Sequence, residues 1–237
     1  MRDVVIVGGG PVGMFLAALL AERGLDVAVW EKRVSPSALS RAIGVHPPAL
    51  EAFSRVGVAD DVVGEAVHIS RGVAKSAGRT LGAVSFAGVS AEFPFVASLP
   101  QHRTEAIISA RLEALNPQAL QRGVELRGID DVDPGHVRLH GRSGGHDVFE
   151  LARFVVGADG ARSAVRSLLR IPATLKIYDD PFVMGDFRDD TGDADDAVIH
   201  LEAGEWSSRS RCPVACGVSS CTPVSRWCVR PPTCSPN

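Results

Sequence analysis

A glycine-rich turn divides the uncharged start of the chain into two parts with different propensities. Residues 3–7 are a β-branched run, typical of a buried parallel strand. Residues 14–23 are good helix formers, and residues 25–30 are again rich in strand formers. This order predicts a strand, a turn, a helix and a second strand, which is the βαβ unit of a Rossmann-like α/β domain.

The uncharged run covers residues 4–21, and its 18 residues reach the lower limit for a membrane span or a signal-peptide core. Residues 8–11 (Gly-Gly-Gly-Pro) interrupt it where a spanning helix has to be continuous. Arg2 and Asp3 cancel each other, so no positively charged segment precedes it. The net charge of −3 gives no reason to expect nucleic acid or an anionic membrane as a partner. We expect a cytoplasmic protein.

The glycines at positions 8, 10 and 13 match the phosphate-binding pattern of dinucleotide-binding domains. Gly8 permits a tight turn, Gly10 lets the backbone approach a pyrophosphate, and Gly13 lets the helix pack closely on the strand. Pro11 and Val12 lie in the same turn, just before the predicted helix, whose N-terminus offers free N–H groups and a positive dipole end to a phosphate. The pattern does not separate FAD from NAD, and a glycine-rich turn of another α/β protein is the alternative.

An acidic residue follows at the spacing that this pattern requires. Glu31 lies 23 residues after Gly8, at the end of the second predicted strand. A carboxylate there accepts hydrogen bonds from the ribose hydroxyls of an adenosine and repels a 2′-phosphate, so NADP is not expected as the tightly bound nucleotide. Lys32 follows directly and is a further candidate for nucleotide binding.

A further strand followed by a turn is predicted near residue 160. Residues 151–156 are an apolar run that leads into Asp159 and Gly160. Ligands bind at the carboxyl ends of strands in open α/β sheets, so Asp159 is a candidate binding residue. Gly160 permits a sharp turn, and Ser163 is placed to cap the helix that follows. The simpler alternative is an Asp-Gly turn with solvated arginines beside it.

Four separated motifs together resemble the single-component FAD-dependent aromatic hydroxylases, the para-hydroxybenzoate-hydroxylase-like monooxygenases. They are the glycine pattern, the segment around Asp159, an Arg-Ala segment with Arg41 before a helix, and a segment with Gln101 before another helix. The sequence is most similar to hydroxylases that tailor aromatic polyketides. The resemblance runs from about residue 3 to about residue 204.

The resemblance implies an FAD-binding α/β domain interleaved with an antiparallel sheet that covers the substrate. It places the FAD-binding domain at residues 1–175, with residues 76–100 contributing to the substrate sheet, and starts the substrate domain at residues 176–204. It implies FAD as cofactor, NAD(P)H and O₂ as co-substrates, and hydroxylation of a small phenolic or polyketide-type substrate. No side chain is assigned as catalytic, because the flavin carries the chemistry. The residues expected to hold FAD are Gly8, Gly10, Pro11, Val12, Gly13, Glu31, Lys32, Arg41, Gln101, Asp159 and Gly160.

Two alternatives within this fold stay open. One is a truncated, catalytically silent fragment that binds FAD; the other, less favoured, is a halogenase or a reductase. No metal site is expected. Eight aspartates lie within residues 179–196, but Asp is favoured in turns and the closing Glu of a Ca²⁺ loop is absent.

The composition changes after residue 204. All five cysteines lie between Cys212 and Cys234, and residues 205–237 contain no Leu, Ile, Phe or Met. The apolar residues of this segment show neither helical nor strand periodicity, so little of it can form a core. We therefore expect an unstructured tail over residues 205–237. Our hypothesis is that this segment comes from a shifted reading frame. Members of the family that the sequence resembles carry a third FAD motif, a Gly-Asp followed by a glycine-rich helix start, which this sequence lacks. If neither of the other reading frames of the parent gene restores an apolar-alternating continuation and this Gly-Asp motif, the hypothesis is wrong.

Overall fold

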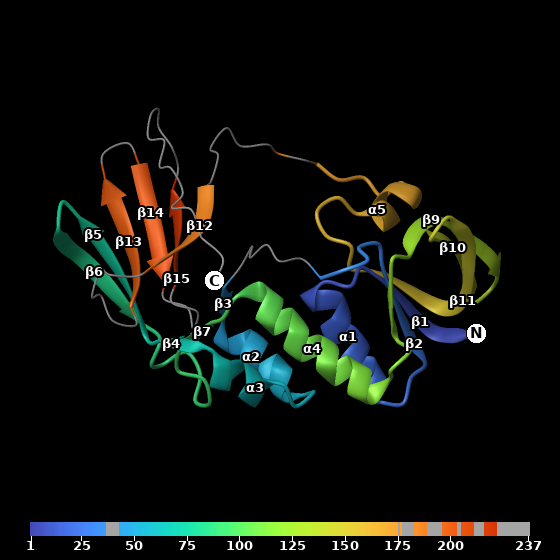
Figure 1. Ribbon diagram of the computed structural model, residues 1–237, viewed down its shortest axis with the longest axis horizontal. Helices are drawn as coiled ribbons and strands as arrows, with labels where there is room; N and C mark the ends of the chain where they lie inside the picture. Colours follow the sequence, from blue (N-terminus) through green and yellow to red (C-terminus); the bar gives the residue numbers. More distant parts are fainter. Residues whose placement is uncertain are drawn as a thin grey trace, which may run out of the picture.

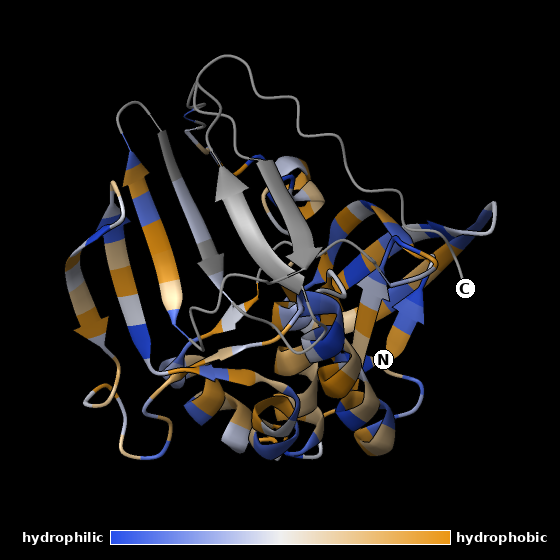
Figure 2. Cartoon of the chain, turned by 60° about the vertical axis from the view of Figure 1, so that its left-hand side comes forward, coloured by the Kyte–Doolittle hydropathy of each residue, from blue (hydrophilic) through white to orange (hydrophobic). Residues whose placement is uncertain are grey.

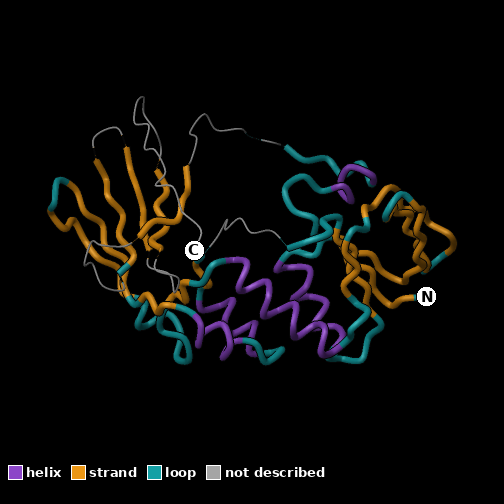
Figure 3. The backbone as a smooth tube through the Cα atoms, viewed as in Figure 1, coloured by secondary structure: helices purple, strands orange, loops and turns teal. Residues whose placement is uncertain are grey.

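The computed structural model of the chain describes residues 1–36, 43–174, 176, 183–188, 196–202, 205–210 and 216–221. Two six-stranded sheets lie at opposite ends of the molecule, and helices α1 to α4 lie between them (Figures 1 and 3). The elements follow one another as β1 (Arg2–Val7), α1 (Pro11–Ala21), β2 (Val27–Glu31), β3 (Gly44–Val45), α2 (Pro47–Ser54), α3 (Ala59–Glu65), β4 (Val67–Ile69), β5 (Arg71–Ser76), β6 (Arg79–Ser85), β7 (Val96–Ser98), α4 (Gln101–Leu115), β8 (Leu120–Arg122), β9 (Glu125–Asp133), β10 (His136–Ser143), β11 (His146–Gly157), α5 (Ala164–Leu168), β12 (Val183–Arg188), β13 (Ala197–Glu202), β14 (Glu205–Ser210) and β15 (Cys216–Cys221).

The first sheet is parallel in one half and antiparallel in the other. Its strand order is β8-β2-β1-β11-β10-β9, and β8, β2, β1 and β11 are parallel. The long strand β11 joins the two halves, because Ala152 lies opposite Arg2 on one side and Val137 on the other. Gly144 and Gly145 both have positive φ and form the two-residue turn from β10 to β11.

The side chains of β1 alternate between two hydrophobic clusters. Val4 and Ile6 pack in the cluster that includes α1, whereas Val5 and Val7 pack with Trp30 on the opposite face. Burial on both faces is typical of a central parallel strand, and it confirms the strand predicted at residues 3–7.

The uncharged run at the start of the chain forms β1 and the 11-residue helix α1. The helix begins at Pro11, earlier than the predicted residue 14, because the fixed φ of proline suits the first helical position. Across the described ranges, no helix has the length and apolar character needed to cross a membrane.

The second sheet is interleaved with the first along the chain, as predicted. Its order is β12-β15-β14-β13-β5-β6, and its neighbours are antiparallel except the parallel pair β13 and β5. Strands β5, β6 and β13 of this sheet each carry both hydrophobic and hydrophilic residues (Figure 2).

The first segment of the chain that contributes to this sheet differs from the predicted residues 76–100. It comprises β5 and β6, because the chain turns at Ala77 and Gly78, both with positive φ, and pairs the residues on either side as a hairpin. Strand β7 instead joins β3 and β4 in a separate three-stranded sheet.

The start of the predicted tail also differs from the sequence-based expectation. Strands β14 and β15 lie within it; β14 pairs with β13, and β15 pairs with β14 and β12. Backbone hydrogen bonds to a neighbouring strand need no hydrophobic period, so the sequence pattern does not reveal these strands. Residues 222–237 lie outside the described residues.

The packing of Trp30 generates a prediction about stability. A Cβ added at Gly141 on β10 would lie 2.7 Å from Trp30 Cζ3, and Trp30 is 1% exposed. We therefore expect Gly141→Ala to lower the free energy of unfolding by about 1–3 kcal/mol, measured by urea unfolding. The control is Gly128→Ala on the facing strand β9, where a Cβ would meet His140 Cβ at an ordinary 3.6 Å. Equal losses in both variants would contradict this account of the core.

Candidate cofactor-binding site

The turn between β1 and α1 is held by backbone contacts that leave no room for side chains. Gly8 has a φ of +113°, and a Cβ there would overlap the backbone of Ala158. The Gly8 N–H donates to the carbonyl oxygen of Trp30 at 2.8 Å, which ties the turn to the end of β2. A Cβ at Gly13 would overlap the carbonyl oxygen of Gly8. Only glycine fits at either position, and α1 therefore begins in contact with the strand end.

Gly10 has a different environment. It directly precedes α1, and a Cβ there would meet no atom within 4 Å. Pro11 takes the first helical position, and Val12 is 70% exposed. The start of α1 is thus open to an approaching group, and the positive end of the helix dipole there favours an anionic one.

Glu31 is a buried carboxylate at the end of β2, with 5% of its surface exposed. Its Oε2 accepts from the Gly9 N–H at 2.8 Å, and its Oε1 accepts from the Arg33 N–H at 2.8 Å and from Arg33 Nε at 3.0 Å. Burial raises the pKa of Glu31, but the hydrogen bonds from Arg33 and Gly9 outweigh burial and leave the pKa below its ordinary value. The carboxylate is therefore ionised at neutral pH and fixed beside the glycine turn.

Asp159 lies just beyond the end of β11 and organises the turn into α5. Its Oδ2 accepts from the N–H groups of Ala164 at 2.6 Å and Val165 at 3.1 Å. Burial raises the pKa of Asp159, but hydrogen bonds from Ser163 and from these backbone groups outweigh it and lower the pKa. Gly160 has a φ of +80°, as the predicted sharp turn requires. The predicted cap is also present, since Ser163 Oγ accepts from the Arg166 N–H at 3.0 Å.

These groups meet in one cavity of about 640 Å³. The predicted cofactor residues that line it are Gly8, Gly10, Pro11, Val12, Glu31, Lys32, Gln101, Asp159 and Gly160. Gly13 is buried beneath the turn, and Arg41 lies outside the described residues. The cavity therefore joins motifs that are far apart in the sequence.

Five further residues line this cavity without having been predicted as cofactor ligands: Arg33, Glu105, Ala158, Ala161 and Arg162. For two of these residues, the sequence separation from a predicted residue could have indicated a place in the cavity. Arg33 lies two residues after Glu31, and Glu105 lies one helical turn after Gln101 on α4. Gln101 Nε2 donates to Glu105 Oε1 at 2.7 Å, as an i,i+4 pair on a helix can.

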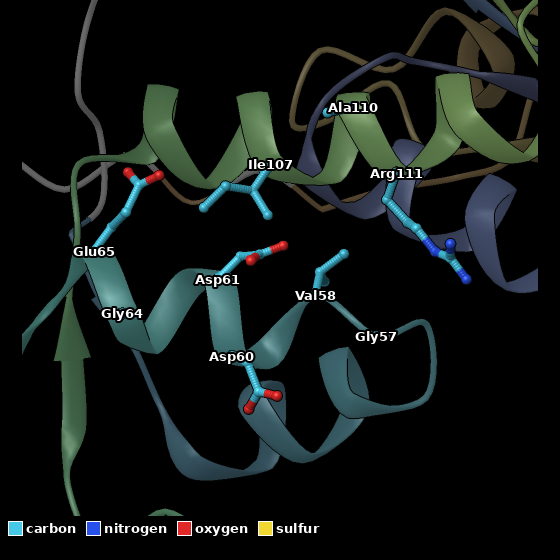
Figure 4. A pocket seen from close by; sticks show the side chains of 9 residues that line it. All are labelled: Gly57, Val58, Asp60, Asp61, Gly64, Glu65, Ile107, Ala110 and Arg111. Atoms are coloured by element: carbon cyan, nitrogen blue, oxygen red, sulfur yellow. The ribbon is translucent and has the colours of Figure 1, made fainter.

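A second hollow, of about 490 Å³, lies between α3 and α4 (Figure 4). Its charged lining is mainly acidic, with Asp60, Asp61 and Glu65 set against Arg111. Arg111 is also engaged elsewhere, because it donates to the carbonyl oxygen of Val56 at 2.8 Å and to a Glu22 carboxylate oxygen at 3.0 Å. An anionic dinucleotide is therefore disfavoured in this hollow.

Most of the acidic stretch at residues 179–196 lies outside the described residues. At its end, Asp196 forms an ion pair with Arg71 at 2.6 Å. Among the described residues, no three His, Cys, Asp or Glu side chains gather as metal ligands would.

Comparison with known proteins identifies the family. The sequence matches the family model described as FAD binding domain over residues 1–214. It is 34% identical over 180 residues to the rifampicin monooxygenase of Streptomyces venezuelae, an alignment that covers 72% of this chain and 34% of that protein. It is 35% identical over 171 residues to the 6-methylpretetramide 4-monooxygenase of Streptomyces rimosus, covering 70% and 30%. The chain thus spans about a third of the length of the curated relatives it matches.

Solved structures agree on the fold. The p-nitrophenol 4-monooxygenase PnpA from Pseudomonas putida DLL-E4 superposes with a TM-score of 0.86 at 24% identity, covering 94% of this chain and 57% of that one. The OxyS anhydrotetracycline hydroxylase from Streptomyces rimosus has a TM-score of 0.74 at 26% identity, covering 93% and 45%. The chain belongs to the FAD-binding domain family, whose members include aromatic and polyketide monooxygenases.

Proposed function

We propose that the chain binds FAD in the cavity at the strand ends and serves as the FAD domain of a monooxygenase that hydroxylates a small aromatic substrate. One observation carries the proposal: the backbone is open at Gly10, between two glycines that admit no side chain, and Glu31 lines the same cavity. These groups fit the cofactor. Free N–H groups suit a pyrophosphate, and an ionised carboxylate suits the hydroxyls of a ribose.

Each part of the ADP moiety has a matching set of residues in this proposal. The pyrophosphate lies against residues 10–12, at the positive end of α1. The adenosine ribose lies at Glu31, with Lys32 supplying positive charge nearby. A hollow of about 90 Å³, lined in part by Trp30 and Val124, shares Glu31 and Lys32 with the main cavity and suits the flat adenine base.

The remaining predicted residues serve the other parts of the cofactor. Asp159 and Gly160 are proposed to approach the pyrophosphate and the ribityl chain, and Gln101 to contact the cofactor from α4. Arg41 is proposed to lie near the flavin. The cavity lining supports the first three assignments, since these residues reach one cavity from different parts of the chain.

FAD, when bound, supplies the redox chemistry that links NAD(P)H, O₂ and an aromatic ring. The residues of this chain bind the cofactor and fix its orientation. The names of the relatives support an aromatic or polyketide-type substrate and favour a monooxygenase over a halogenase or a reductase. A second candidate is FAD binding without hydroxylation, because the chain spans about a third of these relatives.

An assay of the purified chain separates these candidates. Flavin titration measures FAD binding, and NAD(P)H oxidation is then followed with and without phenolic substrates. Substrate-dependent oxidation and a product that gains one oxygen atom support the monooxygenase. FAD binding without either supports the second candidate, and a chain that binds no FAD contradicts both.

Replacing Gly10 by alanine is expected to weaken FAD binding, whereas replacing Gly13 by alanine is expected to destabilise the fold. Gly10→Ala places a methyl group where the pyrophosphate lies, so we expect the FAD Kd to rise by at least about tenfold. Its free energy of unfolding stays within about 1 kcal/mol of the wild type, because the methyl group meets no protein atom. Gly13→Ala overlaps the Gly8 carbonyl and costs about 2 kcal/mol or more of stability.

Flavin fluorescence and urea unfolding measure the two effects of these alanine variants. Gly82→Ala on β6, another open position, is the control for both measurements. Wild-type FAD affinity in Gly10→Ala would contradict the placement of the pyrophosphate.

The lowered pKa of Glu31 predicts how its contribution to stability depends on pH. Glu31→Gln replaces one accepting oxygen by an NH₂ group, which cannot accept from the N–H donors of Gly9 and Arg33. We therefore expect the free energy of unfolding to fall by about 1–3 kcal/mol at neutral pH. The wild-type advantage is complete above the unfolded-state pKa of about 4.3 and is lost as pH falls through the lower pKa of the folded state. Urea unfolding between neutral and acidic pH measures this difference, with the exposed Glu113→Gln on α4 as the control. A pH-independent difference would count against an ionised Glu31.

A further inference from the structure

Glu105 is a buried carboxylate in the wall of the cofactor cavity that the proposed function does not use. It lies on α4, lines the cavity, and has 6% of its surface exposed. Its Oε1 accepts a hydrogen bond from Gln101 Nε2 at 2.7 Å. Burying a carboxylate is costly unless it is well bonded, so this contact is a candidate for a specific role.

The contact determines how the Gln101 amide is oriented. A carboxylate only accepts hydrogen bonds, so the atom of Gln101 that faces Glu105 has to be Nε2 and not Oε1. The two ends of the amide have nearly the same shape, so a hydrogen-bond partner decides which way it points. With Nε2 engaged, the carbonyl oxygen of Gln101 is left to accept a hydrogen bond from a ligand in the cavity.

The carbonyl oxygen of Gln101 restricts which part of a ligand lies next to it. It needs a hydrogen-bond donor, which a hydroxyl group supplies and an ionised phosphate does not. FAD carries hydroxyl groups along its ribityl chain. The negative charge of Glu105 also acts on Arg33: the hydrogen bond to Glu31 is the main cause that raises the pKa of Arg33, and the Glu105 charge raises it further.

We propose that Glu105 is a positioning residue of the cofactor site, holding Gln101 so that its carbonyl oxygen accepts from a ribityl hydroxyl of FAD. This inference rests on the proposed binding of FAD in the cavity. The competing explanation is purely structural: a buried glutamate that stabilises the start of α4 by charge and packing. The two explanations differ in which ligands are affected when Glu105 is replaced.

Binding of FAD and of ADP to the full chain separates the explanations, because ADP has no ribityl chain. We expect Glu105→Ala to raise the FAD Kd by about tenfold and to leave the ADP Kd within about twofold of the wild type. Glu105→Gln, which keeps an oxygen acceptor for Gln101 Nε2, is expected to restore most of the FAD affinity. Flavin fluorescence measures FAD, and calorimetry measures ADP.

A double-mutant cycle tests whether Glu105 acts through Gln101. In a Gln101→Met background, Glu105→Ala should change the FAD Kd by less than about twofold, since the group that it orients is already gone. Glu113→Ala, an exposed position on the same helix, is the control and should bind both ligands like the wild type. Urea unfolding of every variant shows whether each one folds.

The outcomes are distinct. Parallel losses of FAD and ADP affinity, or an undiminished effect in the Gln101→Met background, would overturn the positioning role in favour of the structural one. Unchanged FAD affinity in Glu105→Ala would overturn this proposal while the proposed function stands. A wild-type chain that binds neither ligand would overturn both.

Discussion

The close approach of Gly13 to the carbonyl oxygen of Gly8 is the constraint on which the site depends. No side chain fits between α1 and the end of β1, so the helix begins in contact with the strand. The hydrogen bond from Gly8 to Trp30 and that from the Ala158 N–H to the Val7 carbonyl oxygen bring the ends of β2 and β11 to the same place. The glycine turn that lines the cavity and the positions of Glu31 and Asp159 in it follow from this junction.

The polar groups of the cavity serve the fold and the site at once. Glu31 is bonded to the backbone of the glycine turn, and Asp159 to the N–H groups at the start of α5. Hydrogen bonds lower the pKa of each carboxylate despite its burial, so both are charged and oriented before any ligand arrives. A site built in this way gives up little further conformational entropy when it binds a cofactor.

The local motifs and, through the family resemblance, the interleaving of the two sheets were predictable from the sequence, whereas the late strands and the burial of Glu105 were not. The strand–turn–helix around Gly8, the Ser163 cap and the interleaved sheets follow from glycine positions, capping chemistry and family resemblance. Strands β14 and β15 are held by backbone pairing with neighbours, which leaves no hydrophobic period to detect. Glu105 has a helical spacing from Gln101, but its burial in the cavity depends on how α4 packs.

The most direct test of this account is a crystal structure of the chain with FAD. The account predicts electron density for FAD in the cavity at the strand ends, with the pyrophosphate against residues 10–12 and the adenosine ribose at Glu31. FAD in the acidic hollow between α3 and α4, or a site elsewhere on the chain, would contradict it.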